Sequence, residues 1–257
     1  MVTARSRAAP LRWDVERRRL VRALRRHADR SAGRFLRSYL GSPLPVLGVR
    51  ALRFQVVARS ARTRFRSLPE DAVLSELRAL WDGPWFEERA LAIECLGDFA
   101  RRDEVMAWKL ADQWVDSATG WGLSDALASG PVAQMVAAKP NRFSELLTWT
   151  SSANFWRRRA ATYALKEWVH RGKLGRPFRL LRRLLKDPEF WVQRAVGTWL
   201  RECWKRDRRT TERFLRRHAK VLSRTTITVA TERASKAFRE ELRRRNRRTA
   251  KLAPRRA

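Results

Sequence analysis

Apolar residues recur at helical spacing along most of this chain, as Leu74, Leu77, Leu80 and Trp81 illustrate. No stretch has the strict alternation of apolar and polar residues that a half-buried strand requires. Short segments rich in Gly, Pro, Ser, Asn and Asp interrupt the pattern at 82–84, 117–120, 151–154 and 187–188. The pattern therefore predicts an all-α protein in which brief loops join successive helices.

A short motif repeats within this helical pattern: an aromatic residue is followed four positions later by Arg, and then by Ala. Copies of the motif begin at Trp85, Phe155 and Phe190, with spacings of 70 and 35 residues. A helix pair that repeats about every 35–40 residues is typical of a HEAT-like α-solenoid. We expect a right-handed curved solenoid with a concave groove, built from repeat units at 70–101, 104–138, 141–171, 175–206 and 209–245.

In this prediction a single solenoid domain at 13–242, beginning with a helix from Trp13, lies between basic tails at 1–12 and 243–257. No apolar run reaches the roughly 18 residues that a membrane span needs, and the Arg-rich N-terminus lacks the apolar stretch of a secretion signal. Cys95 and Cys203 lie in apolar helical patterns, which indicates buried thiols in a reducing compartment.

The charge balance changes the picture, because 58 Lys and Arg face only 26 Asp and Glu, giving a net charge of +32. Such a charge implies a polyanionic partner, most simply double-stranded DNA contacted through its backbone in the basic groove. An acidic membrane surface is the weaker alternative, since no membrane-anchoring pattern is present. The three His show no metal-ligand spacing, so we expect no metal and no cofactor. We expect a monomeric, cytoplasmic, nucleoid-associated protein.

One copy of the repeated motif carries an acid in place of its arginine. Where the missing unit should fall, the sequence has Trp121 and, four residues later, Asp125 followed by Ala126. Residues i and i+4 lie on one helix face, so Trp121 and Asp125 should project together. A carboxylate in a basic groove could stabilise the positive charge that develops on a sugar as a glycosidic bond breaks. The alternative is that Asp125 forms an ion pair with an adjacent arginine such as Arg159.

Residues 34 to about 240 resemble the HEAT-like DNA alkylation repair glycosylases, the AlkD family. The resemblance depends on the order and spacing of several matches: Tyr39, Leu47-Gly48-Val49, Leu80-Trp81-Asp82, Glu88-Arg89, Trp121 with Asp125, 155–160, 191–197 and 200–202. It implies a DNA N-glycosylase, a hydrolase of base excision repair that removes cationic N3- and N7-alkylated purines from duplex DNA. Members of this family leave the lesion largely stacked, so no snug base pocket is required.

The resemblance also implies roles for individual residues. Asp125 would be the catalytic carboxylate, Trp121 would pack on the lesion deoxyribose, and Arg159 would contact a phosphate beside the lesion. We predict the DNA-binding residues to be Tyr39, Arg50, Arg89, Arg158, Arg194 and Thr198. For Arg89 and Arg194, bridging neighbouring repeats through carboxylates is the alternative.

Two departures from the family pattern affect the predicted site. Thr198 stands where the family has a second cleft tryptophan, and Trp199 follows one residue later, about 100° around a helix. The segment 51–55 also lacks the Pro and paired Arg often found there. The alternative function is therefore a non-catalytic HEAT-like protein that binds distorted or branched DNA through the same groove.

Overall fold

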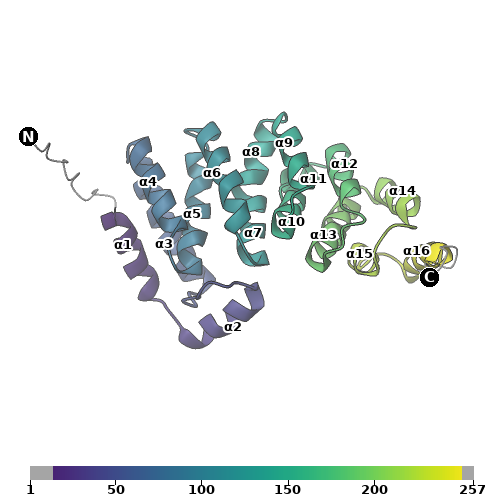
Figure 1. Cartoon of the computed structure of the whole chain (residues 1–257), viewed down its shortest axis with the longest axis horizontal. Coiled ribbons are helices and arrows are strands. Elements are labelled where there is room, and N and C mark those ends of the chain that lie inside the picture. The colour runs from purple at the N-terminus through teal and green to yellow at the C-terminus, as the bar shows by residue number, and fades with distance from the viewer. Residues whose placement is uncertain (1–13, 251–257) are drawn as a thin grey trace, which may run out of the picture. The chain divides into compact units, whose positions relative to one another are not determined.

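The computed structural model describes residues 14–250, and throughout this range the regular secondary structure is helical, as the hydrophobic pattern predicts (Figure 1). The chain divides into two compact units, Met1–Ala107 and Trp108–Ala257, where the sequence suggested one domain at 13–242. In a repeat fold each helix pair contacts only its neighbours, so such a chain need not have one central core. The predicted tail at 1–12 lies outside the described residues.

The first unit consists of α1 (Asp14–Arg25), α2 (Arg30–Leu40), α3 (Ala51–Arg66), α4 (Glu70–Trp81), α5 (Phe86–Phe99) and the beginning of α6 (Glu104–Ser117). Its core is formed by fully buried apolar side chains, among them Leu24, Leu77, Leu91 and Leu96. Arg17 of α1 reaches across to the buried Glu88 of α5, with Nε 2.8 Å from Oε2. The first unit is thus held together by an apolar core and by an ion pair between residues that are distant in sequence.

A buried carboxylate organises the turn that precedes α3. Glu87 of α5 accepts hydrogen bonds from the backbone N–H groups of Leu47 (3.0 Å), Gly48 (2.9 Å) and Val49 (3.3 Å). Gly48 has φ +81°, and a Cβ there would lie 2.1 Å from the carbonyl oxygen of Asp29. Only glycine fits this position, because the left-handed backbone and the close carbonyl both exclude a side chain.

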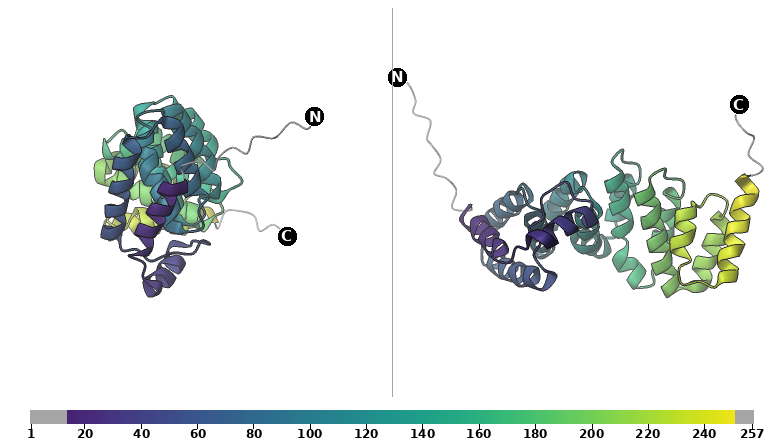
Figure 2. Two further views of the ribbon diagram at one scale, coloured as in Figure 1. Left: turned by 90° about the vertical axis from the view of Figure 1, so that its left-hand side faces the viewer. Right: turned by 90° about the horizontal axis from the view of Figure 1, so that it is seen from below.

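The second unit contains most of α6 and the remaining helices: α7 (Trp121–Leu127), the π-helical turn η1 (Ala128–Val132), α8 (Ala133–Ala138), α9 (Arg142–Trp149), α10 (Phe155–Tyr163), α11 (Lys166–His170), α12 (Gly175–Arg183), α13 (Phe190–Arg206), α14 (Arg208–His218), α15 (Arg224–Ala230) and α16 (Lys236–Ala250). Many of these helices stand side by side in chain order in Figure 2 (right). The predicted loops at 151–154 and 187–188 fall between helices, and the loop predicted at 117–120 begins at Ser117, the last residue of α6.

The helices of the second unit form two layers, so that each repeat contributes one helix to each layer. In the first layer Trp108 of α6 stacks on Trp149 of α9 (5.9 Å between ring centroids), and Phe178 of α12 stacks on Phe214 of α14 (4.7 Å). In the second layer α7, α10, α13 and α15 follow one another. There a Cβ on Gly197 of α13 would lie 2.8 Å from Cβ of Val229, so glycine permits the close approach of α15.

The C-terminal part of this unit differs from the predicted repeat. The fifth unit was expected at 209–245, but it consists of α14 and α15, and α16 is an additional helix. The basic tail was expected from residue 243, yet α16 continues to Ala250. Leu242 is fully buried, and the Asn246 amide donates hydrogen bonds to the carbonyls of Ala219 (3.0 Å) and Leu222 (2.8 Å). These contacts hold α16 in place despite its many arginines.

Two further expectations have clear outcomes. Cys95 and Cys203 are 1% and 0% exposed, so both thiols are buried as predicted. Burial raises the pKa of each thiol well above its ordinary value, which keeps it protonated and unreactive. Within residues 14–250 no helix is both long and apolar enough to cross a bilayer.

Candidate functional site

The four copies of the repeated motif occupy equivalent places in the fold. Trp121, Phe155 and Phe190 are the first residues of α7, α10 and α13, and Trp85 is the residue before α5. Each motif therefore begins the second helix of its pair. The fourth position after the aromatic, Asp125 in α7 and Arg159 in α10, lies one turn into the helix.

Asp125 and Arg159 form a two-point ion pair between adjacent helices of the second layer. Nε of Arg159 donates to Oδ1 of Asp125 at 2.8 Å, and a terminal nitrogen donates to Oδ2 at 2.6 Å. The Arg159 side chain is only 5% exposed and that of Asp125 13%. The substitution of Asp for Arg in one repeat thus provides a carboxylate for the arginine of the next repeat, as the alternative interpretation of the sequence held.

The guanidinium of Arg159 is fixed on its other sides as well. It donates to the carbonyl of Trp191 (2.7 Å) and to the hydroxyl of Tyr163 (3.0 Å), one turn further along α10. It also lies over the Tyr163 and Trp191 rings, 5.0 and 5.7 Å from their centroids. Arg159 therefore occupies an aromatic and polar cage in which its orientation is determined.

Tyr163 is a member of this site that the sequence analysis did not identify. Trp199 packs edge-on against its ring, with centroids 5.5 Å apart and planes at 87°. Trp199 is only 5% exposed, so it supports the site from the core and does not line a cleft. The signal was present in the sequence, since Tyr163 lies four residues after Arg159 and so on the same helix face.

The electrostatics of the pair follow from its burial. Removal from water raises the pKa of Asp125 above its ordinary value, while the hydrogen bond and the charge of Arg159 oppose this rise. Burial, followed by the nearby Asp125 charge, also raises the pKa of Tyr163, so its hydroxyl stays neutral and available for hydrogen bonding. The cluster is thus a directly paired carboxylate and guanidinium with two hydroxyl groups beside them: Tyr163 accepts from Arg159, and Ser124 Oγ lies 3.4 Å from Asp125.

The helix that carries Asp125 has unusual geometry on both sides. Gly120, with φ +82°, turns the chain into α7 immediately before the partly exposed Trp121. Just after α7 the chain widens into the π turn η1, where Gly130 adopts ψ −107° ahead of Pro131. Proline cannot donate a backbone hydrogen bond, so the α-helical ladder must open there. Such π turns are frequent at functional sites.

The other residues predicted in this unit have different environments. The Arg158 guanidinium is bound to the buried Asp187 (2.6 Å) and to the carbonyls of Ser152 and Ala153, which holds the loop before α10. Arg194, in contrast, is exposed on α13, and the half-buried Thr198 donates to its carbonyl at 3.0 Å. Arg194 is therefore open to solvent, whereas Arg158 is engaged within the protein.

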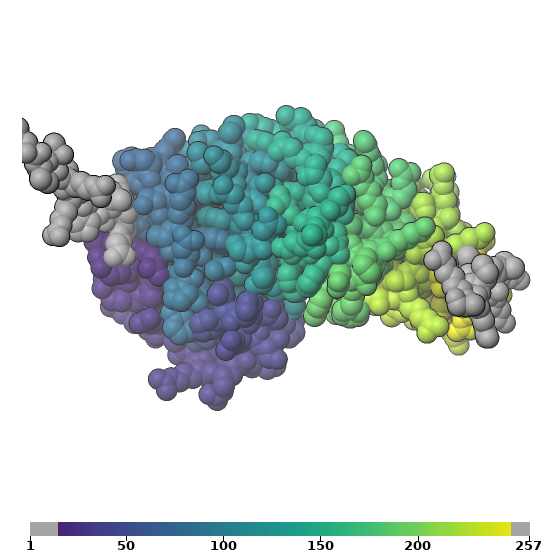
Figure 3. All heavy atoms as spheres, in the orientation of Figure 1, coloured from purple at the N-terminus to yellow at the C-terminus, as the bar shows by residue number. Residues whose placement is uncertain are grey.

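The remaining predicted residues belong to the first unit. Tyr39 is 58% exposed and stacks on Phe35, which is 68% exposed, one turn earlier on α2 (5.8 Å, 8° between planes). Figure 3 shows the segment around α2 on the surface, in dark violet. Arg50 is exposed before α3, and Arg89 is partly buried with its guanidinium 5.2 Å from the Trp81 ring centroid. The first unit thus presents a stacked aromatic pair and an exposed arginine.

Comparison with known proteins agrees with this architecture. A family model for the DNA alkylation repair enzymes matches residues 20–234. A predicted DNA alkylation repair enzyme from Enterococcus faecalis has the same fold, with a TM-score of 0.73 and 17% identity over 82% of this chain and 98% of that chain. AlkD2 from Streptococcus mutans gives a TM-score of 0.60 and 19% identity over 70% of this chain and 89% of that one. No curated protein sequence matches this chain.

Proposed function

We propose that this chain, which belongs to the DNA alkylation repair enzyme family, is a DNA glycosylase that excises positively charged N3- and N7-alkylated purines from duplex DNA in base excision repair. The observation that carries the proposal is the Asp125 carboxylate, held at two points by Arg159 in a strongly basic chain. A carboxylate among so many arginines repels phosphate, so its place one turn after Trp121 supports a chemical role in addition to the ion pair with Arg159.

In the proposed reaction, Asp125 stabilises the positive charge that develops on the deoxyribose as the base departs, and it orients the attacking water. A cationic alkylpurine is a good leaving group, because its departure neutralises its own charge. Little acid catalysis is then required. The described part of the site is consistent with this: the hydrogen bonds of the Asp125 carboxylate and of the Ser124 and Tyr163 hydroxyls involve no histidine.

Arg159 has a positioning role in this proposal. Its guanidinium is nearly inaccessible and fully engaged with Asp125, Tyr163 and the Trp191 carbonyl, so it fixes the direction of the carboxylate. This role replaces the phosphate contact that the family resemblance implied for Arg159. Trp121, on the same helix face as Asp125, would pack against the lesion deoxyribose.

For the duplex itself, the proposed contacts are those predicted residues with exposed side chains: Tyr39, Arg50 and Arg194. Arg89 is retained as a candidate because the residue is only partly buried. Arg158 is left out, because its donors are used by Asp187 and two carbonyls. Backbone contacts of this kind position the protein without selecting a sequence.

One observation favours a second function, the non-catalytic binding of distorted or branched DNA. Thr198 stands where the family resemblance places a cleft tryptophan, and its hydroxyl is bonded to the Arg194 carbonyl. Trp199 is buried against Tyr163 and does not replace that aromatic surface. A protein without this surface would bind DNA through the same arginines and release no base.

The deciding experiment is single-turnover release of 7-methylguanine from a duplex by the parent protein and by Asp125→Asn. We expect the substitution to lower the rate by roughly 100-fold or more, because the carboxylate acts mainly in the transition state. Affinity for undamaged duplex should be equal or higher, since a phosphate-repelling charge is removed. Asp116→Asn is the matched control, because Asp116 is an exposed carboxylate of the same unit, paired with Arg157.

The outcomes separate the two functions. An inactive parent that binds DNA tightly would establish the non-catalytic alternative. An active parent whose Asp125→Asn variant keeps its full rate would remove Asp125 from the mechanism.

A further inference from the structure

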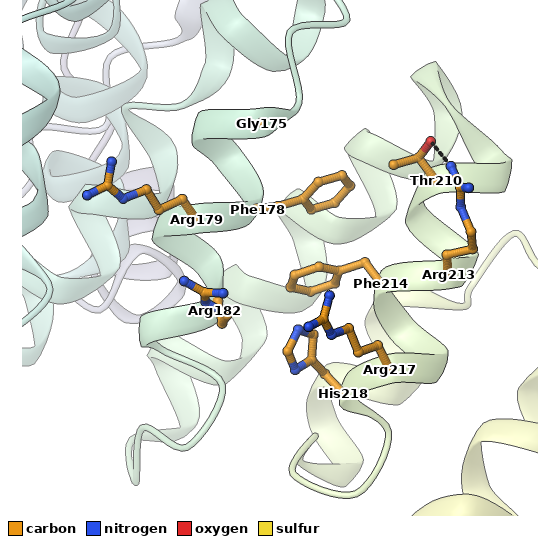
Figure 4. Close-up of a pocket in the computed structure, with 9 residues that line it drawn as sticks. All are labelled: Gly175, Phe178, Arg179, Arg182, Thr210, Arg213, Phe214, Arg217 and His218. Carbon is orange, nitrogen blue, oxygen red and sulfur yellow. Dashed lines mark hydrogen bonds between the residues drawn. The ribbon is translucent and has the colours of Figure 1, made fainter.

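A second basic site lies between α12 and α14, in the first layer of the second unit. Its cavity has a volume of about 530 Å³, within the range of roughly 300–1,000 Å³ that is usual for ligand sites. Its lining comes entirely from α12 and α14, whereas Asp125 and Arg159 are on α7 and α10 of the second layer. This α12–α14 cavity, shown in Figure 4, is therefore separate from the candidate active site.

Four exposed arginines line the α12–α14 cavity, and no acidic residue does: Arg179, Arg182, Arg213 and Arg217. Among the described residues, no carboxylate forms an ion pair with any of them. Many other arginines of this unit are neutralised, as Arg158 is by Asp187 and Arg216 by Glu241. Two of these arginines are engaged elsewhere: the Arg179 guanidinium lies 5.8 Å from the Phe143 ring centroid, and Arg213 donates to the Thr210 hydroxyl at 3.2 Å. The charges of Arg182 and Arg217 are uncompensated, so an anion bound between them would be stabilised.

The positive charge of the cavity also acts on His218. Burial lowers the pKa of His218, and the nearby Arg217 and Arg182 lower it further. In Figure 4 the side chains of these three residues gather at the same end of the cavity. The imidazole therefore stays neutral at pH 7, beside the two guanidinium groups.

Aromatic rings supply the rest of the lining. Phe178 and Phe214 stack nearly parallel, with centroids 4.7 Å apart and planes at 16°. His218 packs on Phe214 at 4.5 Å and 55°. All three side chains are only partly buried, so they offer ring surface to a ligand. Proteins that bind unpaired nucleic-acid strands combine these two kinds of group: guanidinium groups bind the phosphates, and exposed aromatic rings stack on the bases.

We propose that the α12–α14 cavity binds an unpaired segment of DNA, with bases against Phe178 and Phe214 and phosphates on Arg182 and Arg217. A duplex keeps its bases stacked inside the helix, so it would leave the phenylalanines without a partner and gain little from this cavity. An unpaired strand uses both the arginines and the phenylalanines. The site lies outside the proposed excision machinery and does not depend on glycosylase activity.

The test measures binding of a fluorescein-labelled oligothymidylate of about 12 nucleotides, and of a duplex, by anisotropy at about 0.15 M salt. The Arg182→Gln/Arg217→Gln double variant of the full chain removes two charges from the cavity. The Arg206→Gln/Arg209→Gln double variant is its control, because it removes two exposed charges from the same unit outside the cavity. Phe214→Leu removes the ring and retains an apolar side chain.

We expect the cavity double variant to bind the single strand at least tenfold more weakly than the control variant, and Phe214→Leu to bind it about fivefold more weakly than the parent. Duplex affinity and 7-methylguanine release should equal those of the control within about twofold, which separates this proposal from the excision site. Equal single-strand affinity of the two double variants would overturn the proposal. A parallel loss of duplex affinity would also overturn it, because the cavity would then recognise phosphates alone. The charge variants alter exposed side chains, so misfolding does not complicate their comparison.

Discussion

At the residue scale, the buried pair of Asp125 and Arg159 links the catalytic role proposed for Asp125 to the stability of the fold. Removing one partner leaves the other as an uncompensated buried charge, which costs about 3–5 kcal/mol. We therefore expect Arg159→Met and Asp125→Leu each to lower the free energy of unfolding by about that much. The double variant should be no less stable than either single variant, because no charge is left buried. Urea unfolding of the three proteins measures this coupling.

The half-exposed pair of Arg62 and Glu94 provides the control for that cycle, since its side chains are 31% and 32% exposed. Such a pair contributes about 0–1 kcal/mol, so Arg62→Gln should have little effect on unfolding. If the double variant lost as much unfolding free energy as the Asp125→Leu and Arg159→Met variants together, the two residues would not be coupled and the ion pair would be contradicted.

The pH dependence of excision is also decided at the residue scale. Burial raises the pKa of Asp125, and only the ionised carboxylate can stabilise a sugar cation. The rate should therefore fall as the pH falls through this raised pKa, above the ordinary aspartate value of about 3.9. Single-turnover release between about pH 4 and 8, corrected for spontaneous depurination, tests this, with circular dichroism to verify folding. A rate that stays constant down to pH 4 would disprove the assignment.

The pH dependence of folding stability that arises from Asp125 has the opposite sign to the pH dependence of the excision rate. A raised pKa means that the folded protein binds this proton more tightly than the unfolded chain does. The contribution of Asp125 to stability is therefore present below the ordinary pKa and is lost as the pH rises through the folded-state pKa. Asp125→Asn should remove this contribution.

At the scale of elements, Glu87 ties α5 to the turn before α3. Its carboxylate accepts three backbone hydrogen bonds, and the amide of Glu87→Gln would keep only one accepting oxygen. We expect this substitution to lower the unfolding free energy by about 1–3 kcal/mol, since buried N–H groups lose their partner. Glu94→Gln on the same helix, in a half-exposed pair, is the control and should change it by less than about 1 kcal/mol. Equal effects would show that the carboxylate does not organise the turn.

At the scale of the whole molecule, we expect the net charge of +32 to dominate the affinity for duplex DNA. Each neutralised phosphate releases a condensed counterion, which contributes about −0.9 to the slope of log affinity against log salt concentration. An interface with several phosphate contacts should give a slope of roughly −4 or steeper on duplex DNA, largely independent of sequence. Titrations of two unrelated duplexes at several salt concentrations measure it. An affinity that hardly changes between low and moderate salt would exclude phosphate-driven binding.

The sequence by itself determined the helical character of this chain, the loop positions, the burial of both cysteines and the register of the repeated motif. These features depend on interactions between residues near in sequence, or on simple hydrophobicity, and both are visible in the spacing of residues. The same spacing placed Trp121 and Asp125 on one face of α7. The spacing was also compatible with an ion pair between Asp125 and Arg159, but it could not show that this pair forms.

Only the tertiary structure decided which partners meet across helices. Helical periodicity fixes the face on which Arg159 lies, but not that its guanidinium is enclosed by Asp125, Tyr163 and the Trp191 carbonyl. The same limit applies to Asn246, whose contacts 24 and 27 residues earlier in the chain extend α16 beyond the expected boundary. Burial and long-range hydrogen bonding arise when distant segments pack together, and local patterns do not encode those distances.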